Sequence, residues 1–394
     1  MLSKTWTYSL RMSLLILAPF DLLASLGMDV YLPVVPQMPA ALHTTPATIQ
    51  LTLSFYMLVL GCGQLAFGPL SDWLGRRPVL LGGALLFDIA SAALVATESG
   101  PVFVGLRVAQ AAGAAAALVA IFATVRDVFA GRRESTVIYS LLGSMLGFVP
   151  ALGPAVGASV AYAFGWRGIF ASLALLGVLA STQAFLCWPE TRPPAHAVAK
   201  LAHFRAILTN APFLIYTLGS STALGAFFVY FSISSRVLVG RIGLTPFAFS
   251  VVFATVALVM ITTSRFSVRL VAWWGERGCL IRGMTLLLIG GALLSVCQLV
   301  AYPSLAGFIA PMWVVAVGIS ITCAVTANGA LRLFSHAAGT ATALYACGES
   351  LVVGIAGTAF VVLLPADTAW PLAAFCGVFG LVTISLACTL RNSS

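Results

Sequence analysis

The chain has 394 residues, of which 60% are hydrophobic and only 8% are charged, and its mean hydropathy is +1.05. Ordinary soluble domains carry roughly 25% charged residues, so this composition excludes a soluble fold and indicates an all-α polytopic membrane protein. The formal net charge of +9 could reflect either binding to nucleic acid or the topology of a membrane protein. The positions of the basic residues along the chain distinguish these two explanations.

Twelve apolar segments are long enough to cross a bilayer as helices, which takes about 20 residues each. In chain order they are 10–33, 47–70, 78–97, 101–123, 136–161, 168–188, 211–234, 246–264, 280–300, 305–327, 338–361 and 369–390. The first is too long for a signal peptide and has no small-residue cleavage site. We therefore expect it to remain in the protein as the first transmembrane helix.

The basic residues gather on one side of the predicted membrane. If the N-terminus is cytoplasmic and the segments alternate, all but four of the 20 Lys and Arg residues fall at or near the cytoplasmic face. The four exceptions are Arg107, which lies within a segment, and Arg167, Arg236 and Arg241. This asymmetry is the positive-inside pattern and predicts that both termini are cytoplasmic. The basic charge therefore reflects membrane topology, and we expect no nucleic-acid partner.

Neither the cysteines nor the glycines predict a cofactor. The eight cysteines lack metal-binding spacing, and most lie inside apolar segments, where they resemble small packing residues. No GxxxxGK[ST] nucleotide-binding loop occurs in the chain. We expect no cofactor and no bound metal.

A long polar stretch divides the chain. Residues 188–210 contain Pro193-Pro194 and three basic residues between the sixth and seventh segments. We predict a six-helix bundle at 1–188, a cytoplasmic linker at 189–210 and a second bundle at 211–394. Two repeated halves are typical of secondary transporters that work by alternating access.

Residues 63–80, GQLAFGPLSDWLGRRPVL, join the second and third segments and combine turn and charge signals. They include Gly68-Pro69, Asp72, Gly75, Arg76 and Arg77. The first pair is expected to end a helix, Gly75 permits a tight turn, and the charged residues can form charge-assisted bonds at a membrane face. From the spacing alone, a basic loop that merely follows the positive-inside tendency remains an alternative. A weaker echo, with Gly275 and Arg277, lies between the eighth and ninth segments.

The 63–80 segment resembles the signature loop of the major facilitator superfamily, with Trp73 where the family usually has arginine. Arg107-Val-Ala-Gln110-Ala-Ala-Gly113 resembles the family's helix 4 motif, and Pro150 followed by Gly153-Pro154-Ala-Val-Gly157 is similar to the helix 5 motif of drug antiporters. The resemblance implies a twelve-span drug:proton antiporter. Its conformational switching would involve Gly68, Asp72, Gly75, Arg76, Arg77, Pro150, Gly153, Pro154 and Gly157.

Further segments resemble the bacterial chloramphenicol and florfenicol exporters. They are PFDLLASLGMDVYLP at 19–33, FATVRDVFA at 122–130, FIAPMWVV at 308–315, TANGALRLF at 326–334 and DTAWP at 367–371. This resemblance implies a protein in the lipid of the bacterial inner membrane that exchanges neutral amphenicol antibiotics for protons. We expect it to be a monomer. A broader multidrug:proton antiporter is the main alternative. A proton-coupled importer should lack the helix 5 motif, and a receptor has no support in these short loops.

Three charged residues within the segments are candidates for proton coupling, because charges inside a membrane usually face a cavity or a partner. At about 1.5 Å per residue, Asp21 lies roughly 18 Å and Asp29 roughly 6 Å below the outer end of the first helix, and Arg107 lies roughly 9 Å deep in the fourth. Arg107 can therefore pair with either acid. We hypothesise that Asp21 carries the proton and that Arg107 stabilises its charged form; a static ion pair between the helices is the alternative.

Two other acids and a set of aromatic residues are open to more than one interpretation. Asp88 either faces the cavity or pairs with a neighbour, and Glu349 is either a second proton site or a hydrogen-bonded packing residue. An amphenicol needs a mostly apolar pocket with a few polar anchors. Besides Asp21 and Arg107, the candidates for substrate contact are Tyr56, Tyr139, Phe227, Phe228, Tyr230 and Tyr345, each of which could instead be a packing residue.

Overall fold

The computed structural model describes residues 6–129, 132–192, 201–300 and 303–390, and within these ranges it contains helices and no strand. Eleven stretches of this part are long and apolar enough to cross a membrane. Two predicted segments, the fifth and the sixth, lie in one helix, α6 (Arg133–Cys187), whose backbone breaks at Gly165. Gly165 has φ 71°, a conformation that glycine adopts readily, so α6 has two arms that match the two predicted segments.

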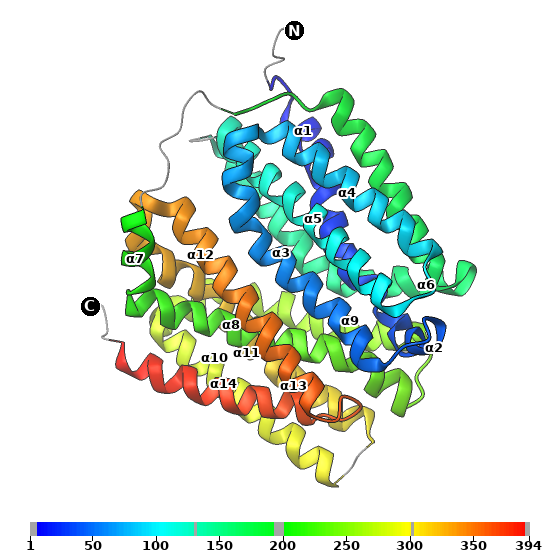
Figure 1. Cartoon of the computed structure of the whole chain (residues 1–394). Helices are drawn as coiled ribbons and strands as arrows, with labels where there is room; N and C mark the ends of the chain where they lie inside the picture. Colours follow the sequence, from blue (N-terminus) through cyan, green and yellow to red (C-terminus); the bar gives the residue numbers. More distant parts are fainter. Residues whose placement is uncertain (1–5, 130–131, 193–200, 301–302, 391–394) are drawn as a thin grey trace. The chain divides into compact units, whose positions relative to one another are not determined.

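The chain divides into two compact units, residues 1–197 and 198–394 (Figure 1). This division falls within the predicted linker, part of which forms the short helix α7 (Leu201–Leu208). The first unit contains α1 (Leu10–Asp29), η1 (Leu32–Gln37), α2 (Met38–Ala41), α3 (Pro46–Leu74), α4 (Arg76–Ala96), α5 (Gly100–Phe129) and α6.

The second unit begins with α7 and then repeats the long helices. They are α8 (Ala211–Ser235), η2 (Arg236–Arg241), α9 (Pro246–Ser264), α10 (Ser267–Val300), α11 (Leu305–Leu331), η3 (Arg332–Ala337), α12 (Ala338–Leu351), η4 (Val352–Gly357), α13 (Thr358–Leu363) and α14 (Trp370–Thr389). The predicted eleventh segment is interrupted, because η4 is a π-helical turn between α12 and α13.

The expected helix end at Gly68-Pro69 is wrong. Helix α3 continues through Pro69 to Leu74 and ends at Gly75, where φ is 110°. Proline removes its own N–H and its ring crowds the carbonyl group four residues earlier, but membrane helices tolerate both where neighbouring groups compensate. The positive φ at Gly75 ends the helix, and α4 begins at the next residue. This places Asp72 on a helix rather than in an open loop.

Glycine contacts hold the third and fourth spans of each unit together. In the first unit, a Cβ on Gly83 of α4 would lie 2.8 Å from the Gly113 carbonyl oxygen of α5. In the second unit, a Cβ on Gly283 of α10 would lie 2.9 Å from the Gly318 carbonyl oxygen of α11. Small residues of this kind let membrane helices approach closely. The same device at matching positions shows that the two units are built on a repeated plan.

The helix 5 motif packs α6 against the end of α1. A Cβ on Gly157 would overlap the Val30 carbonyl oxygen, and one on Gly153 would lie 2.9 Å from the Asp29 Cβ. Pro150 and Pro154 lie inside α6, whose backbone leaves helical angles at Gly165 rather than at either proline. The glycines of this motif therefore let the two helices touch.

We expect Gly157→Ala to separate α1 from α6 and to lower the thermal stability of the detergent-solubilised protein by several degrees. The contact is with backbone, which cannot move aside as a flexible side chain can. The matched control is Gly68→Ala, because nothing lies within 4 Å of a Cβ built there. Equal thermal unfolding of the two variants would contradict the assigned packing role.

Candidate functional site

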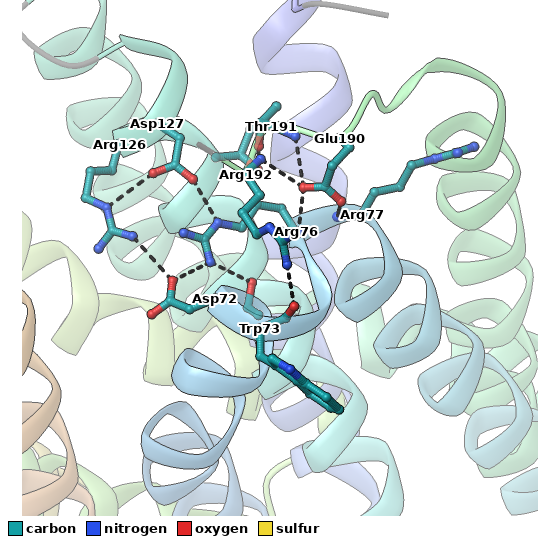
Figure 2. Close-up of polar contacts among 11 residues, drawn as sticks. Asp72, Trp73, Arg76, Arg77, Arg126, Asp127, Glu190, Thr191 and Arg192 are labelled. Carbon is teal, nitrogen blue, oxygen red and sulfur yellow. Dashed lines mark hydrogen bonds and ion pairs between the residues drawn. The ribbon is translucent and has the colours of Figure 1, made fainter. Parts of the chain in front are cut away.

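A charged cluster centres on Arg76 at the start of α4 (Figure 2). The guanidinium donates to Asp72 Oδ1 at 2.6 Å through Nη1 and to Asp127 Oδ2 at 2.8 Å through Nε, and Nη1 also lies 3.3 Å from Ser71 Oγ. The Arg76 and Asp127 side chains are only 2% and 3% exposed, whereas Asp72 is 54% exposed. Arg76 therefore joins α3, α4 and α5 through one largely buried ion pair and one exposed one.

Arg126 extends this cluster on its solvent side. Its Nε lies 3.5 Å from Asp127 Oδ1, and its Nη2 lies 4.0 Å from Asp72 Oδ1. The Arg126 side chain is 53% exposed, so solvent screens these two contacts. The buried Arg76–Asp127 pair is consequently the stronger part of the cluster.

Glu190, which follows α6, caps the start of α4. Its carboxylate accepts hydrogen bonds from the backbone N–H groups of Arg76 at 2.9 Å and Arg77 at 3.2 Å, and also from those of Thr191 and Arg192. Gly75 supplies no capping side chain, and a Cβ there would lie 2.4 Å from Glu190 Oε2. A carboxylate at a helix N-terminus satisfies free N–H groups and interacts favourably with the helix dipole.

Arg77 ties α4 to the end of α6. Its Nη2 donates to the Phe185 carbonyl oxygen at 2.8 Å, and its guanidinium lies 5.8 Å from the Phe185 ring centroid. The second unit has the equivalent arrangement. Arg277 follows the positive-φ residue Gly275 and donates to the carbonyl oxygens of Ala387 at 3.1 Å and Cys388 at 2.8 Å, near the end of α14. The weak sequence echo therefore corresponds to a repeated helix-end clamp.

The second unit has an ion pair at the same place as the Arg76–Asp127 pair, but the acid and the base have exchanged positions. Glu276 follows Gly275 and pairs with Arg332 after α11 at 3.3 Å, where the first unit pairs Arg76 with Asp127. The side chains of Arg332 and Glu276 are 45% and 27% exposed. The repeated plan is therefore kept, but only the first unit buries its ion pair.

Trp73 lies on the outside of the cluster. The residue is 74% exposed and its ring points away from the charged side chains in Figure 2, while its carbonyl oxygen accepts a hydrogen bond from Arg192. Trp273 has the corresponding position before Gly275 and is 72% exposed. Exposed tryptophans near helix ends are typical of the membrane–water interface. Trp73 therefore fits an interfacial residue and takes no part in the ion pairs.

Arg107 is fully buried in α5 and contacts α1 and α3. Its Nη1 donates to the Gly27 carbonyl oxygen at 2.7 Å and to the Gln110 side-chain oxygen. Its guanidinium carbon lies 4.7 Å and 4.3 Å from the ring centroids of Tyr31 and Tyr56. Cation–π contacts of a desolvated arginine are worth about 2 kcal/mol or more. The aromatic faces and a carbonyl oxygen therefore surround this charge.

The expected ion pair between Arg107 and Asp21 or Asp29 is not formed within the described part of the chain. Both acids are buried in α1, with 2% and 6% exposure. Asp21 Oδ2 has no hydrogen-bond partner there, and neither do Nε and Nη2 of Arg107. The structure thus brings both acids and the arginine into one bundle, with donors and acceptors that are not yet paired.

The predicted substrate-contacting aromatic residues lie in different environments. Tyr56 is fully buried and donates to the Ala24 carbonyl oxygen at 2.9 Å. Tyr230 is also fully buried, with ring centroids 5.2 Å from Phe253 and 5.9 Å from Phe308.

Phe228 is buried too, whereas Phe227 and Tyr345 are half-buried. The Tyr139 side chain lies outside the described residues. Of the described aromatic candidates, only Phe227 and Tyr345 are partly exposed.

Asp88 meets a neighbour from α6. Its Oδ2 accepts a hydrogen bond from Ser181 Oγ at 2.6 Å, and a Cβ built on Gly177 would lie 2.0 Å from its Oδ1. Asp88 also lines a small cavity with Phe20, Phe87 and Gly177 among other apolar residues. Of the two interpretations of this acid, hydrogen bonding between α4 and α6 is therefore the one that the geometry favours.

Comparison with known proteins identifies the family. The family model of the Major Facilitator Superfamily matches residues 21–358 of this chain. The chain belongs to the Major Facilitator Superfamily. As a member, it is a multi-pass membrane protein and a secondary transporter of small molecules rather than an enzyme.

Similar proteins and structures agree with this membership. The chain is 50% identical to a chloramphenicol resistance protein of Pseudomonas aeruginosa, over 98% of this chain and 92% of that protein. It is 28% identical to the multidrug resistance protein MdtL of Escherichia coli K12, over 85% of each.

Among solved structures, a bacterial homologue of the human lysosomal transporter Spinster aligns with a TM-score of 0.74 and 13% identity, covering 98% of this chain and 95% of that one. A D-xylose–proton symporter aligns with a TM-score of 0.73 and 17% identity, covering 95% and 97%. At these identities the likeness shows the superfamily fold alone.

Sequence reasoning missed two acids of the charged cluster around Arg76, namely Asp127 and Glu190. Asp127 stands beside Arg126 at the end of the fourth span, where an unpaired acid signals a partner on a neighbouring helix end. Glu190 follows the sixth span, and the helix that it caps begins after a glycine with no capping side chain. Both signals are present in the sequence, but only the fold shows which helix start each acid meets.

Proposed function

We propose that this transporter exports chloramphenicol and related amphenicols across the bacterial inner membrane in exchange for protons, by alternating access and without a cofactor. The observation that carries the proposal is the 50% identity, over nearly the whole chain, to a chloramphenicol resistance protein. Both termini would lie in the cytoplasm, as the positive-inside pattern predicts, and the protein would work as a monomer.

The buried charges of the first unit support proton exchange. Asp21 is a membrane carboxyl with one oxygen unpartnered, and Arg107 has two unpartnered nitrogens in the same bundle. Ionisable groups at such positions are costly to bury and commonly carry protons or bind substrate. We assign proton coupling to Asp21 and Arg107, with Asp29 as a further candidate.

The alternative is a broader multidrug:proton antiporter, which the likeness to a multidrug resistance protein favours. The two proposals differ in their substrates, because a multidrug exporter would also carry organic cations. They share the buried charges of the first unit, so the residues alone do not separate them.

We expect expression of this chain to lower the accumulation of chloramphenicol and florfenicol in energised bacteria but to leave that of ethidium unchanged. A protonophore should abolish the difference from cells with an empty vector, since export would then lack its driving force. Lowered ethidium accumulation would support the multidrug alternative. Unchanged accumulation of both amphenicols would overturn the proposed export.

A further inference from the structure

Glu349 is the one acid that lies well inside a membrane span of the second unit. The unit's other acids within its spans and loops are Glu276, beside the break at Gly275, and Asp367, between α13 and α14. Glu349 lies nine residues after the start of the span Thr340–Leu363, which is about 14 Å along a helix. The carboxyl group is therefore near the middle of the membrane.

One hydroxyl group donates to Glu349, and a tyrosine and a cysteine lie near it. Ser220 Oγ of α8 donates to Glu349 Oε2 at 2.5 Å. Tyr345, one turn earlier on α12, donates to Thr326 Oγ1 of α11 at 3.2 Å. Tyr345 and Cys323 of α11 lie close enough to Glu349 to interact with it electrostatically.

No described Lys or Arg lies within ion-pair distance of Glu349. The described basic residues on elements that pack against α12 are Arg205 of α7 and Arg332 of η3, and Arg332 pairs with Glu276. Because an ionised carboxylate without a cation is costly in a membrane, its protonated form is favoured whenever water is withdrawn.

Water must nevertheless reach this carboxyl group. The side chains of Glu349 and Tyr345 are only partly buried within their unit, and a carboxyl at this depth is too costly to expose to lipid. The exposed part must therefore face water rather than lipid, and that water supplies a route for protons.

The backbone beside Glu349 is irregular. The π-helical turn η4 begins three residues later, and such turns often occur at functional sites in helices. Next to Glu349, a Cβ on Gly348 would lie 3.2 Å from the Thr217 side chain of α8. Helices α8 and α12 thus pack closely where the carboxyl meets Ser220. A shift of one against the other would remove its hydroxyl donor and favour the protonated form.

We propose that Glu349 is a second exchangeable-proton site, located in the second unit, which adds one proton to each transport cycle. This inference rests on the proposed exchange of a neutral amphenicol for protons. Asp21 keeps the essential exchange, and Glu349 takes up a proton from one side and releases it to the other. Each proton moves between the carboxyl oxygen and water, so no other reactant is required.

The number of protons sets the steepest substrate gradient that the transporter can maintain. One pH unit supplies about 1.4 kcal/mol per proton, and that free energy corresponds to about a tenfold concentration ratio. With the membrane potential clamped at zero, a neutral substrate should reach about 100-fold per pH unit with two protons and about tenfold with one.

The test is the steady-state chloramphenicol gradient in proteoliposomes under an imposed pH difference. We expect about 100-fold per pH unit for the unmodified chain and about tenfold for Glu349→Gln. Glu276→Gln is the matched control, because it makes the same change at an acid of the same unit that pairs with Arg332 outside the proposed site, and it should retain the 100-fold ratio. A merely structural role of Glu349 would alter rates but leave the gradient unchanged.

A second measurement does not depend on drug transport. The carboxyl infrared band of the purified full chain should change between acidic and alkaline buffer, and one component of that change should be missing in Glu349→Gln. An unchanged gradient in Glu349→Gln, or a difference spectrum identical to that of the unmodified chain, would overturn the proposal. If the unmodified chain forms no chloramphenicol gradient but the infrared component is present, the proposed export is wrong. The assignment of Glu349 as an exchangeable-proton site is then retained.

Discussion

Asp21→Asn should abolish proton-driven export of chloramphenicol, reducing the steady-state gradient in proteoliposomes to background. The asparagine side chain cannot take the negative charge that would draw Asp21 toward the unpaired nitrogens of Arg107. We propose that this attraction drives the return of the empty transporter. Glu349 has no described cation partner and cannot replace it. Exchange of labelled for unlabelled chloramphenicol needs no net proton movement and should persist.

The protein itself should tolerate this substitution. Asp21 Oδ2 makes no hydrogen bond within the described part of the chain, so asparagine leaves no new unpaired charge and the thermal stability should not fall. Asp88→Asn is the matched control, because it makes the same change in the same unit at an acid that Ser181 holds through one carboxylate oxygen. Normal proton-driven export by Asp21→Asn would refute the assignment.

Arg76→Ala should be among the most destabilising single changes in the first unit. It leaves Asp127, whose side chain is 3% exposed, with only its contact to Arg126. Removing one partner of a buried ion pair costs about 3–5 kcal/mol, and the remaining Arg126 contact places the expected loss near the lower value. Thermal unfolding of the detergent-solubilised protein should show it as a clear fall in midpoint.

Two variants separate the buried charge from other effects of the change. Arg126→Ala removes an exposed partner of the same acid and should cost less than about 1 kcal/mol. The double variant Arg76→Met, Asp127→Leu removes both buried charges and should recover much of the stability lost in Arg76→Ala. A double variant as unstable as the single one would show that the pair's charge is not the cause.

The sequence predicted the positions of the spans well because each depends on a local property. A run of about 20 apolar residues must form a helix in a membrane, whatever its neighbours are. Helix ends depended on finer detail. Pro69 looked like the end of the helix, yet α3 continues for five more residues to Leu74. It ends there because Gly75 has a positive φ. The fifth and sixth segments meet at Gly165 without a loop, a junction that hydropathy does not reveal.

Partners across helices were harder to predict. Residue counting placed Arg107 at a depth between Asp21 and Asp29, but depth along a helix does not tell which way a side chain turns. In the structure, Arg107 faces the Gly27 carbonyl oxygen and two tyrosine rings. The aromatic candidates show the same limit, since Tyr230 and Tyr345 share a residue type but only Tyr345 is partly exposed.

The contacts at the start of the third span are repeated in the two halves of the chain, but they differ in strength. In each half an arginine, Arg77 or Arg277, fastens the third span to the last one. The accompanying ion pair is buried around Arg76 but solvent-exposed at Glu276 and Arg332, where screening makes it worth less than about 1 kcal/mol. The two units thus share the same helix arrangement, but the ion pair at the helix end is stronger in the first unit than in the second. We therefore expect the backbone to bend at Gly275 at a lower free-energy cost than at Gly75.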